Sequence, residues 1–103
     1  MKKFLLCILA TLGLTTACGQ STYEVDEFTT ASGKTVKFHA LMHACIRIQY
    51  DGKEIQIDPV SRLRDRTVDY ATMPKADYIF VTHEHADHYD AAALKTLTDD
   101  KTQ

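Results

Sequence analysis

The sequence has little of several features that would place it in common protein classes. It contains only three cysteines, two of them before residue 20, so a framework of disulfides is not indicated. Its 12 basic side chains are outnumbered by 14 acidic ones and form no basic stripe, which argues against a nucleic-acid partner. The apolar run at residues 4–14 is shorter than the about 20 apolar residues of a membrane-spanning helix. Internal repeats and low-complexity segments are also absent.

The N-terminus has the three regions of a secretory signal peptide in their usual order. A short cationic start, Met1-Lys2-Lys3, precedes the apolar run FLLCILATLGL, and small residues follow at positions 15–17. A buried core helix is the alternative, but the flanking residues fit export better. We therefore predict a signal peptide at residues 1–17 and export from a bacterial cytoplasm. Without Lys2 and Lys3, 10 basic residues face 14 acidic ones.

The sequence TTACGQS around Cys18 resembles the processing site of bacterial lipoproteins, in which the cysteine becomes the lipidated first residue. Thr15 stands where that family favours leucine, and Leu14 lies one position earlier, so ordinary cleavage after Ala17 remains open. With lipid at Cys18 the protein would be anchored to the cell envelope, in the outer membrane or facing the periplasm; otherwise it would be secreted. Cys45 would then have no disulfide partner and is expected to be a small buried residue.

The mature chain shows mainly strand patterns. Residues 18–34 read as a linker and a first strand, and alternation at 35–42 and 44–50 predicts two more strands. Asp51-Gly52 is a hairpin signal, because both residues tolerate a positive φ. Another strand is expected at 54–58, with Ile55 and Ile57 pointing inward and Pro59 ending it. Arg47 and Gln49 are expected on the opposite side from Ile46 and Ile48.

The second half of the chain reads differently. Residues 67–73 predict a short helix, and the apolar run at 77–82 predicts a fully buried strand. Asp90 is a good N-cap for the helical pattern AAALKTL. The organisation is therefore a mainly antiparallel sheet followed by one strand–loop–helix segment, an α/β or α+β fold.

The loop of that segment carries a dense cluster of metal-binding side chains, HEHADH. Coming off a strand, His83 and His85 are two apart and project to the same side, so they can hold one ion. Asp87 keeps the same period and His88 follows, so these two can hold a second ion beside the first. Imidazole and carboxylate suit zinc, and also iron or manganese. Glu84 would point away from the pair.

The stretch VTHEHADH at residues 81–88 resembles the H-x-H-x-D-H signature of metallo-β-lactamase-fold hydrolases at all four signature positions. The stretch HACIRIQYDGKEIQIDPV at 43–60 resembles their opening hairpin, closest to the branch of ascorbate-phosphate lactonase-like and phospholipase-D-like members. Met42 departs from the glycine common there. MPKADYIFVTHEHADH also resembles the segment that leads to the metal loop. The resemblance covers roughly residues 35–98.

This resemblance implies a four-layer αββα sandwich with metals at one rim, of which residues 35–103 would form the N-terminal part. It also implies the roles of the site residues. Asp58 would accept a hydrogen bond and so orient a ligand or a water, and His43 would line the same rim. Both also fit ordinary polar positions at turns and strand ends. The signature assigns His83 and His85 to the first metal, and Asp87 and His88 to the second.

The expected chemistry is hydrolysis of an ester, lactone or phosphodiester bond in a small-molecule substrate. The expected cofactor is a divalent metal, two zinc ions by preference. Such an ion lowers the pKa of its bound water to about 7 and so supplies hydroxide, which Asp87 can hold in line. No serine or cysteine nucleophile stands out. His85 favours hydrolysis, since oxygen-reducing diiron relatives usually carry glutamate there. The polar run with Arg62, Arg64 and Arg66 is a solvated loop or a contact for an anionic substrate.

The sequence holds no histidine after His88, although the resemblance implies further ligands and a second sheet downstream. We therefore expect an N-terminal fragment of a complete hydrolase, or else a natural short product with an exposed apolar sheet face. The alternative function is a non-catalytic envelope lipoprotein or an inactive remnant that keeps the motif. The remaining histidine, His39, is interpreted as structural.

Overall fold

The computed structural model describes residues 23–103. The predicted signal peptide at residues 1–17 and the predicted lipidation site at Cys18 lie outside this part. Within the described residues, no helix has the length and apolarity required to cross a membrane.

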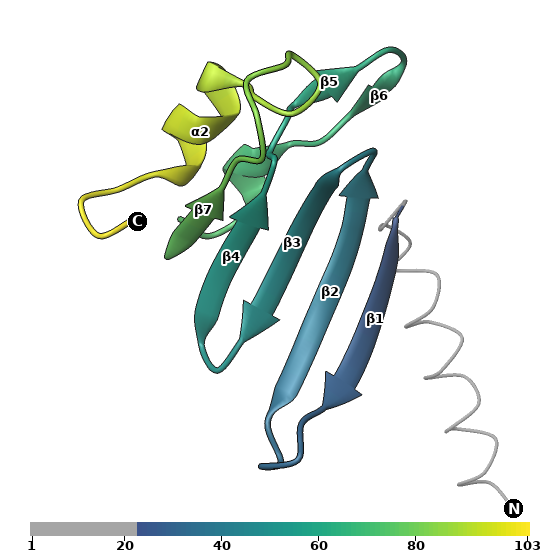
Figure 1. Cartoon of the computed structure of the whole chain (residues 1–103), viewed down its shortest axis with the longest axis vertical. Helices are drawn as coiled ribbons and strands as arrows, with labels where there is room; N and C mark the ends of the chain where they lie inside the picture. The colour runs from purple at the N-terminus through teal and green to yellow at the C-terminus, as the bar shows by residue number, and fades with distance from the viewer. Residues whose placement is uncertain (1–22) are drawn as a thin grey trace, which may run out of the picture.

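A five-stranded sheet forms the body of the described chain (Figure 1). Its spatial order is β1-β2-β3-β4-β7, and each neighbouring pair is antiparallel except β4 and β7, which are parallel. The fold class predicted from the sequence is therefore confirmed. The strands are β1 (Glu24–Thr29), β2 (Thr35–Met42), β3 (Cys45–Tyr50), β4 (Lys53–Ile57) and β7 (Tyr78–Phe80).

The β3–β4 hairpin forms as the sequence predicts. Tyr50 pairs with Lys53, which leaves Asp51 and Gly52 as a two-residue turn. Their φ angles are 50° and 75°, the left-handed values of a primed hairpin turn. This turn type matches the twist of the flanking strands, so it sets the register of β3 against β4.

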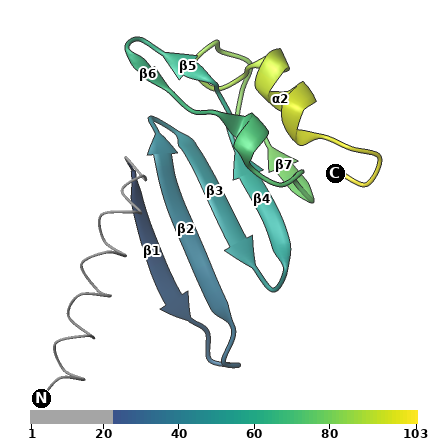
Figure 2. The same ribbon diagram turned by 180° about the vertical axis from the view of Figure 1, so that it is seen from behind.

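The connection between β4 and β7 contains three short elements: β5 (Arg62–Leu63), β6 (Arg66–Thr67) and the 3₁₀ helix η1 (Tyr70–Thr72). The helix predicted at 67–73 is thus reduced to one 3₁₀ turn, capped by the Asp69 carboxylate. Helix α2 (Ala91–Leu97) follows the loop at residues 81–90, called the histidine loop below. Element η1 lies on the sheet face that points away from the viewer in Figure 1 and toward the viewer in Figure 2. These elements cover one sheet face.

Helix α2 begins where the sequence predicts. The Asp90 side chain accepts hydrogen bonds from the backbone N–H groups of Ala92 and Ala93, which satisfies two donors of the first turn. Its second carboxylate oxygen accepts from the Ser61 backbone and hydroxyl. The cap therefore also ties α2 to the segment that follows β4.

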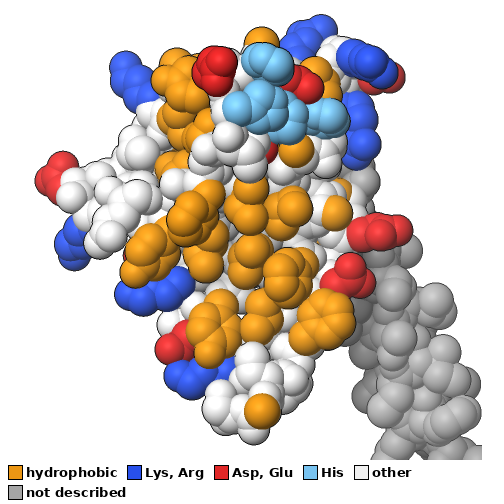
Figure 3. Space-filling view, in the orientation of Figure 1, with side chains coloured by type: hydrophobic (Ala, Val, Ile, Leu, Met, Phe, Trp, Pro, Cys, Tyr) orange, Lys and Arg blue, Asp and Glu red, His pale blue; other side chains and the backbone are white. Residues whose placement is uncertain are grey.

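The strands separate an apolar sheet face from a polar one, as their alternation predicts. Register pairs Phe38 with Ile48 and Ile48 with Ile55, so these side chains share one face. That face is not covered by any described residue, and hydrophobic side chains spread across it (Figure 3). Ile55 and Ile57 lie on this face with Ile46 and Ile48, and both are half-buried there. The expected exposed apolar face is what the described chain presents.

The opposite face, which carries the polar positions of the strands, is the covered one. Gln56 is fully buried on it, and Arg47 is mostly buried, in an ion pair with Glu54 at 2.8 Å. His39 is buried and contacts Gln49 at 2.8 Å, in agreement with a structural role. The apolar core lies between this face and the covering elements; its buried members are Leu41, Met42, Cys45, Val60, Val68, Tyr70, Ala76, Ala93 and Leu97.

The strand predicted at 77–82 is shorter and less buried than expected. Only Tyr78–Phe80 pair with β4, and Phe80 is 56% exposed. The reason is position: β7 is the last strand of the sheet, and the apolar face on which Phe80 lies is open. The outer edge of β7 contacts the C-terminal segment, because the backbone N–H of Ile79 donates a hydrogen bond to the carbonyl of Gln103 at 2.8 Å.

Candidate metal centre

One rim of the sheet collects the candidate ligands. Strands β2, β4 and β7 run in the same direction, so the residues that follow each of them meet at one edge (Figure 1). His43 follows β2, Asp58 follows β4 and the histidine loop follows β7. Histidine side chains gather at that end of the molecule (Figure 3). Sheet topology thus brings together residues that are up to 45 positions apart in the chain.

Asp58 is the buried anchor of the rim. It is 1% exposed, with a left-handed φ of 45°, a conformation that aspartate tolerates better than most residues. One carboxylate oxygen accepts from the Thr82 backbone at 2.7 Å. The other accepts from the Thr82 hydroxyl at 2.7 Å and lies 2.8 Å from His88 Nδ1. Asp58 therefore fastens the histidine loop to the end of β4.

The charge state of Asp58 follows from these contacts. Burial by itself opposes ionisation, but the hydrogen bonds from His88 and Thr82 outweigh it, so the pKa of Asp58 lies below its usual value. The carboxylate is ionised at neutral pH and holds the proton of His88 on Nδ1. Nε2 of His88 is then left as a lone-pair donor.

The ligand atoms fall into two overlapping groups. One consists of His83, His85 and Asp87, and the other of His43, Asp87 and His88. Within each group one ligand atom per residue lies within 4.8 Å of the others. The rings of His83 and His85 are 4.6 Å apart, as expected for residues two apart, and the rings of His83 and His88 are 4.0 Å apart. Asp87 belongs to both groups.

These donors suit a divalent metal. Two or more imidazoles with one carboxylate are typical of zinc sites and also of iron and manganese sites. The pKa of Asp87 is lowered: some burial opposes ionisation, but its own backbone N–H and the His43 ring favour the anion. The fixed tautomer of His88 is the arrangement that metal-binding histidines usually have, with the second nitrogen held by a carboxylate.

Thr82 belongs to the candidate site, and the sequence interpretation missed it. It donates two hydrogen bonds to Asp58, and its hydroxyl lies 3.0 Å from Nδ1 of His83. Its place directly before the first histidine of the motif is the signal that could have drawn attention to it. Glu84 is exposed and belongs to neither group, in keeping with its expected orientation.

The arginine-containing segment forms the β5–β6 hairpin near the same rim (Figure 1). Register pairs Arg62 with Thr67 and Leu63 with Arg66, so these two arginines lie on opposite faces of the hairpin. Ser61, at its start, is held by Asp90 at 2.8 Å. The described structure gives neither arginine a contact with the ligand groups.

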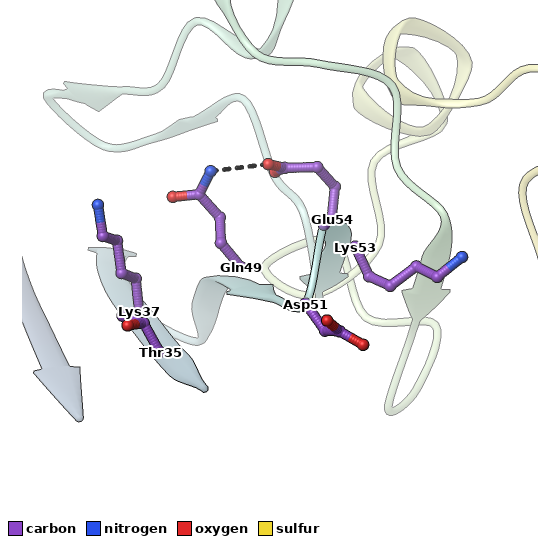
Figure 4. A pocket seen from close by; sticks show the side chains of 7 residues that line it. Thr35, Lys37, Gln49, Asp51, Lys53 and Glu54 are labelled. Carbon is purple, nitrogen blue, oxygen red and sulfur yellow. Dashed lines mark hydrogen bonds between the residues drawn. The ribbon is translucent and has the colours of Figure 1, made fainter. Parts of the chain in front are cut away.

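A surface hollow of about 260 Å³ lies at the other end of the sheet (Figure 4). Within it, Gln49 donates to Glu54 at 2.8 Å (Figure 4). The hollow is near the β3–β4 turn and far from the rim with the histidines, so it is separate from the candidate metal centre. Its lining residues are Thr35, Lys37, Gln49, Asp51, Gly52, Lys53 and Glu54.

Comparison with known proteins places this arrangement in a family. The family model described as "Beta-lactamase superfamily domain" matches residues 37–99. The chain is 46% identical over 52 residues to a UPF0173 protein of Pyrococcus abyssi and 38% identical over 52 residues to a UPF0173 metal-dependent hydrolase of Caldivirga maquilingensis. Each match covers 50% of this chain but only 22% and 23% of those relatives.

A solved structure agrees with the sequence matches. The crystal structure of a protein described as a metal-dependent hydrolase, from Parabacteroides distasonis, superimposes with a TM-score of 0.73 and 40% sequence identity. The match covers 79% of this chain and 35% of the other. The family match spans more than half of the chain and includes all four signature residues, and the shared fold is that of the described sheet and helix. The chain therefore belongs to the beta-lactamase superfamily domain family.

Proposed function

We propose that this protein is a metal-dependent hydrolase that cleaves an ester, lactone or phosphodiester bond. The observation that carries the proposal is the pair of overlapping ligand groups that share Asp87 at one rim. The relatives described as metal-dependent hydrolases support the class of reaction. The chain covers only 35% of the solved relative, so the catalytic activity of a complete fold is itself proposed here.

A divalent metal held by these residues would supply an activated water at neutral pH and would polarise the bond that is cleaved. The chain's own residues would hold the metal ions and orient the ligand atoms. His83 and His85 present imidazoles from the loop after β7, and Asp58 keeps Nε2 of His88 free by holding its Nδ1 proton. Asp87 stays ionised, so its free carboxylate oxygen can accept a hydrogen bond from a bound water or substrate. Two zinc ions are the expected metal content, with iron or manganese as alternatives.

The substrate is proposed to be a small anionic molecule. The support is the β5–β6 hairpin, which begins four residues after Asp58 and carries Arg62, Arg64 and Arg66. All three side chains are exposed, so they are free to pair with a phosphate or carboxylate. The lactonase-like and phospholipase-D-like resemblance suggests a phosphodiester or a lactone.

The test combines metal content with turnover. The full chain is loaded with Zn²⁺, Fe²⁺ or Mn²⁺, its metal content is measured by mass spectrometry, and hydrolysis of bis(p-nitrophenyl) phosphate, p-nitrophenyl acetate and a simple lactone is followed. We expect bound metal and turnover that Asp87→Asn abolishes. Glu84→Gln is the matched control, since Glu84 lies in the same loop outside both ligand groups. Bound metal with no turnover of any substrate would favour the non-catalytic lipoprotein.

We also propose that the protein is exported and anchored through lipid at Cys18. The support is the signal-like order of residues 1–17 and the TTACGQS sequence. Mass spectrometry of the N-terminal peptide from membrane fractions should show a lipid-modified Cys18. In Cys18→Ser the protein should leave the membrane fraction. An unmodified N-terminus after Ala17 in wild type would instead indicate ordinary secretion.

A further inference from the structure

We propose that His43, from the β2–β3 turn, is a third ligand of the second ion, beside Asp87 and His88. This inference rests on the proposed function, because it assigns a ligand to the same centre. It goes beyond the signature motif, which supplies only two residues to that ion. The proposal depends on the separation of three donor atoms, on the backbone of the turn and on the number of ligands.

The donor atoms have the separation of ligands around one ion. His43 Nε2 lies 3.0 Å from Asp87 Oδ2, and His88 Nε2 lies 3.5 Å from the same oxygen. Tetrahedral ligands at about 2.0 Å from zinc are about 3.3 Å apart, so the two observed distances bracket that value. The centroids of the His43 and His88 rings are 5.1 Å apart in an edge-to-face arrangement, and one nitrogen of each ring lies within 4.8 Å of the other.

The backbone holds His43 in position for this purpose. Its φ is 51°, in the left-handed region where a non-glycine residue is uncommon. The register of β2 against β3 shifts between Ala40 and Met42, directly before the turn. A bulge of this kind re-aims the side chains that follow it, and bulges are frequent next to functional sites. The turn therefore directs an imidazole across the rim to Asp87, 44 positions further along the chain.

The number of ligands supports the same conclusion. Catalytic zinc sites usually have three protein ligands and one open position. With His43 included and Asp87 shared, each of the two groups contains three residues of this chain.

A positioning role is the competing explanation. In that case the His43 ring would donate a hydrogen bond from Nε2 to Asp87 and would not contact the ion. The two roles predict different behaviour for glutamine, whose amide can donate a hydrogen bond but is a poor ligand for zinc. His43→Gln therefore separates the two explanations. His43→Gly removes the ring and suits a φ of 51°. The His43 side chain is 42% exposed, so both variants should keep the fold.

The experiment measures metal binding directly. The full chain and both variants are titrated with Zn²⁺ against a chromophoric chelator, and Co²⁺ absorption reports the coordination of each bound ion. We expect two ions in wild type. In both His43 variants the second ion should bind at least 10-fold more weakly and the Co²⁺ spectrum should change, while the first ion is unaffected. Glu84→Gln serves again as the control.

Three results would overturn the inference in different ways. Two ions bound by His43→Gly with wild-type affinity would show that His43 is not a ligand and would leave the proposed hydrolase intact. Full binding by His43→Gln, with weak binding by His43→Gly, would make His43 a positioning residue. If wild type bound no Zn²⁺ or Co²⁺ at all, both the inference and the proposed function would fall. Far-UV circular dichroism of each variant identifies any loss of fold.

Discussion

At the scale of single residues, Asp58 connects the end of β4 to the candidate metal centre. Its carboxylate is buried, ionised and shared between Thr82 and His88. A buried charge is tolerated only when its hydrogen bonds are satisfied, and here three donors surround it. Asp58 thus stabilises the loop and sets the tautomer of His88, a proposed metal ligand, at the same time.

This arrangement predicts the effect of Asp58→Asn. The amide can still accept a hydrogen bond, but it can no longer fix the Nδ1 proton of His88 with a negative charge. We expect affinity for Zn²⁺ to fall by about 10- to 100-fold, as for other partners of metal-bound histidines. Competition with a chromophoric chelator measures it, with Asp26→Asn on exposed β1 as the control. An unchanged affinity in Asp58→Asn would contradict the proposed role.

At the scale of elements, the cap of α2 joins two parts of the chain. Asp90 accepts hydrogen bonds from the first turn of the helix and from Ser61, which begins the segment leading into β5. The helix has only seven residues, so it depends on its cap and on packing more than on propensity. Leu97, fully buried, supplies that packing.

Removing this cap should destabilise the protein measurably. For Asp90→Ala we expect the free energy of unfolding to fall by about 2 kcal/mol, from the lost N-cap and the lost charged contact to Ser61. Asp90→Asn keeps a capping oxygen and should cost less. Urea unfolding followed by circular dichroism measures both, and Asp100→Ala, at an exposed position, should be near neutral. Equal stability of Asp90→Ala and wild type would refute the structural role.

The same residue predicts a dependence on pH. Burial opposes ionisation of Asp90, but hydrogen bonds from Ser61 and from the helix N-terminus outweigh it, so its pKa in the folded protein is lowered. Folding therefore favours the anion. Its stabilising contribution is complete above the unfolded pKa of about 3.9 and is lost as the pH falls through the lower folded value. Urea unfolding at a series of pH values should show a shallower acid-side decline in Asp90→Ala than in wild type.

At the scale of the whole molecule, the described chain is a sheet covered on one side only. The elements between β4 and β7, together with α2, pack on the polar-patterned face, while the face with Phe28, Phe38 and Phe80 is open. These three rings are 57%, 39% and 56% exposed. An open apolar surface of this kind binds hydrophobic probes.

A dye-binding experiment tests this description. The chain should raise the fluorescence of anilinonaphthalene sulfonate without denaturant, and Phe28→Ser should reduce the signal because it removes a ring from the open face. Val25→Ser is the matched control, since Val25 is also exposed on β1 but projects to the opposite face. Equal fluorescence of the two variants would show that the dye does not bind the open face.

Particular residues show how far sequence patterns carried the prediction. The Asp51-Gly52 turn and the Asp90 cap were predictable, because both depend on contacts within a few residues. The burial of residues 77–82 was predicted wrongly, because an apolar run does not reveal whether its strand has a neighbour or a cover on each side. Thr82 was missed, because its partner Asp58 is 24 positions away.

The sequence by itself determined the local elements and the presence of a metal-binding motif, since strand alternation, turn chemistry and the two-residue spacing of His83 and His85 are short-range properties. Tertiary structure alone decided which groups share a site. The parallel direction of β2, β4 and β7 brings His43 and Asp58 to the histidine loop, and packing of α2 and η1 selects which sheet face is buried. Both outcomes depend on contacts between distant segments, which no local pattern encodes.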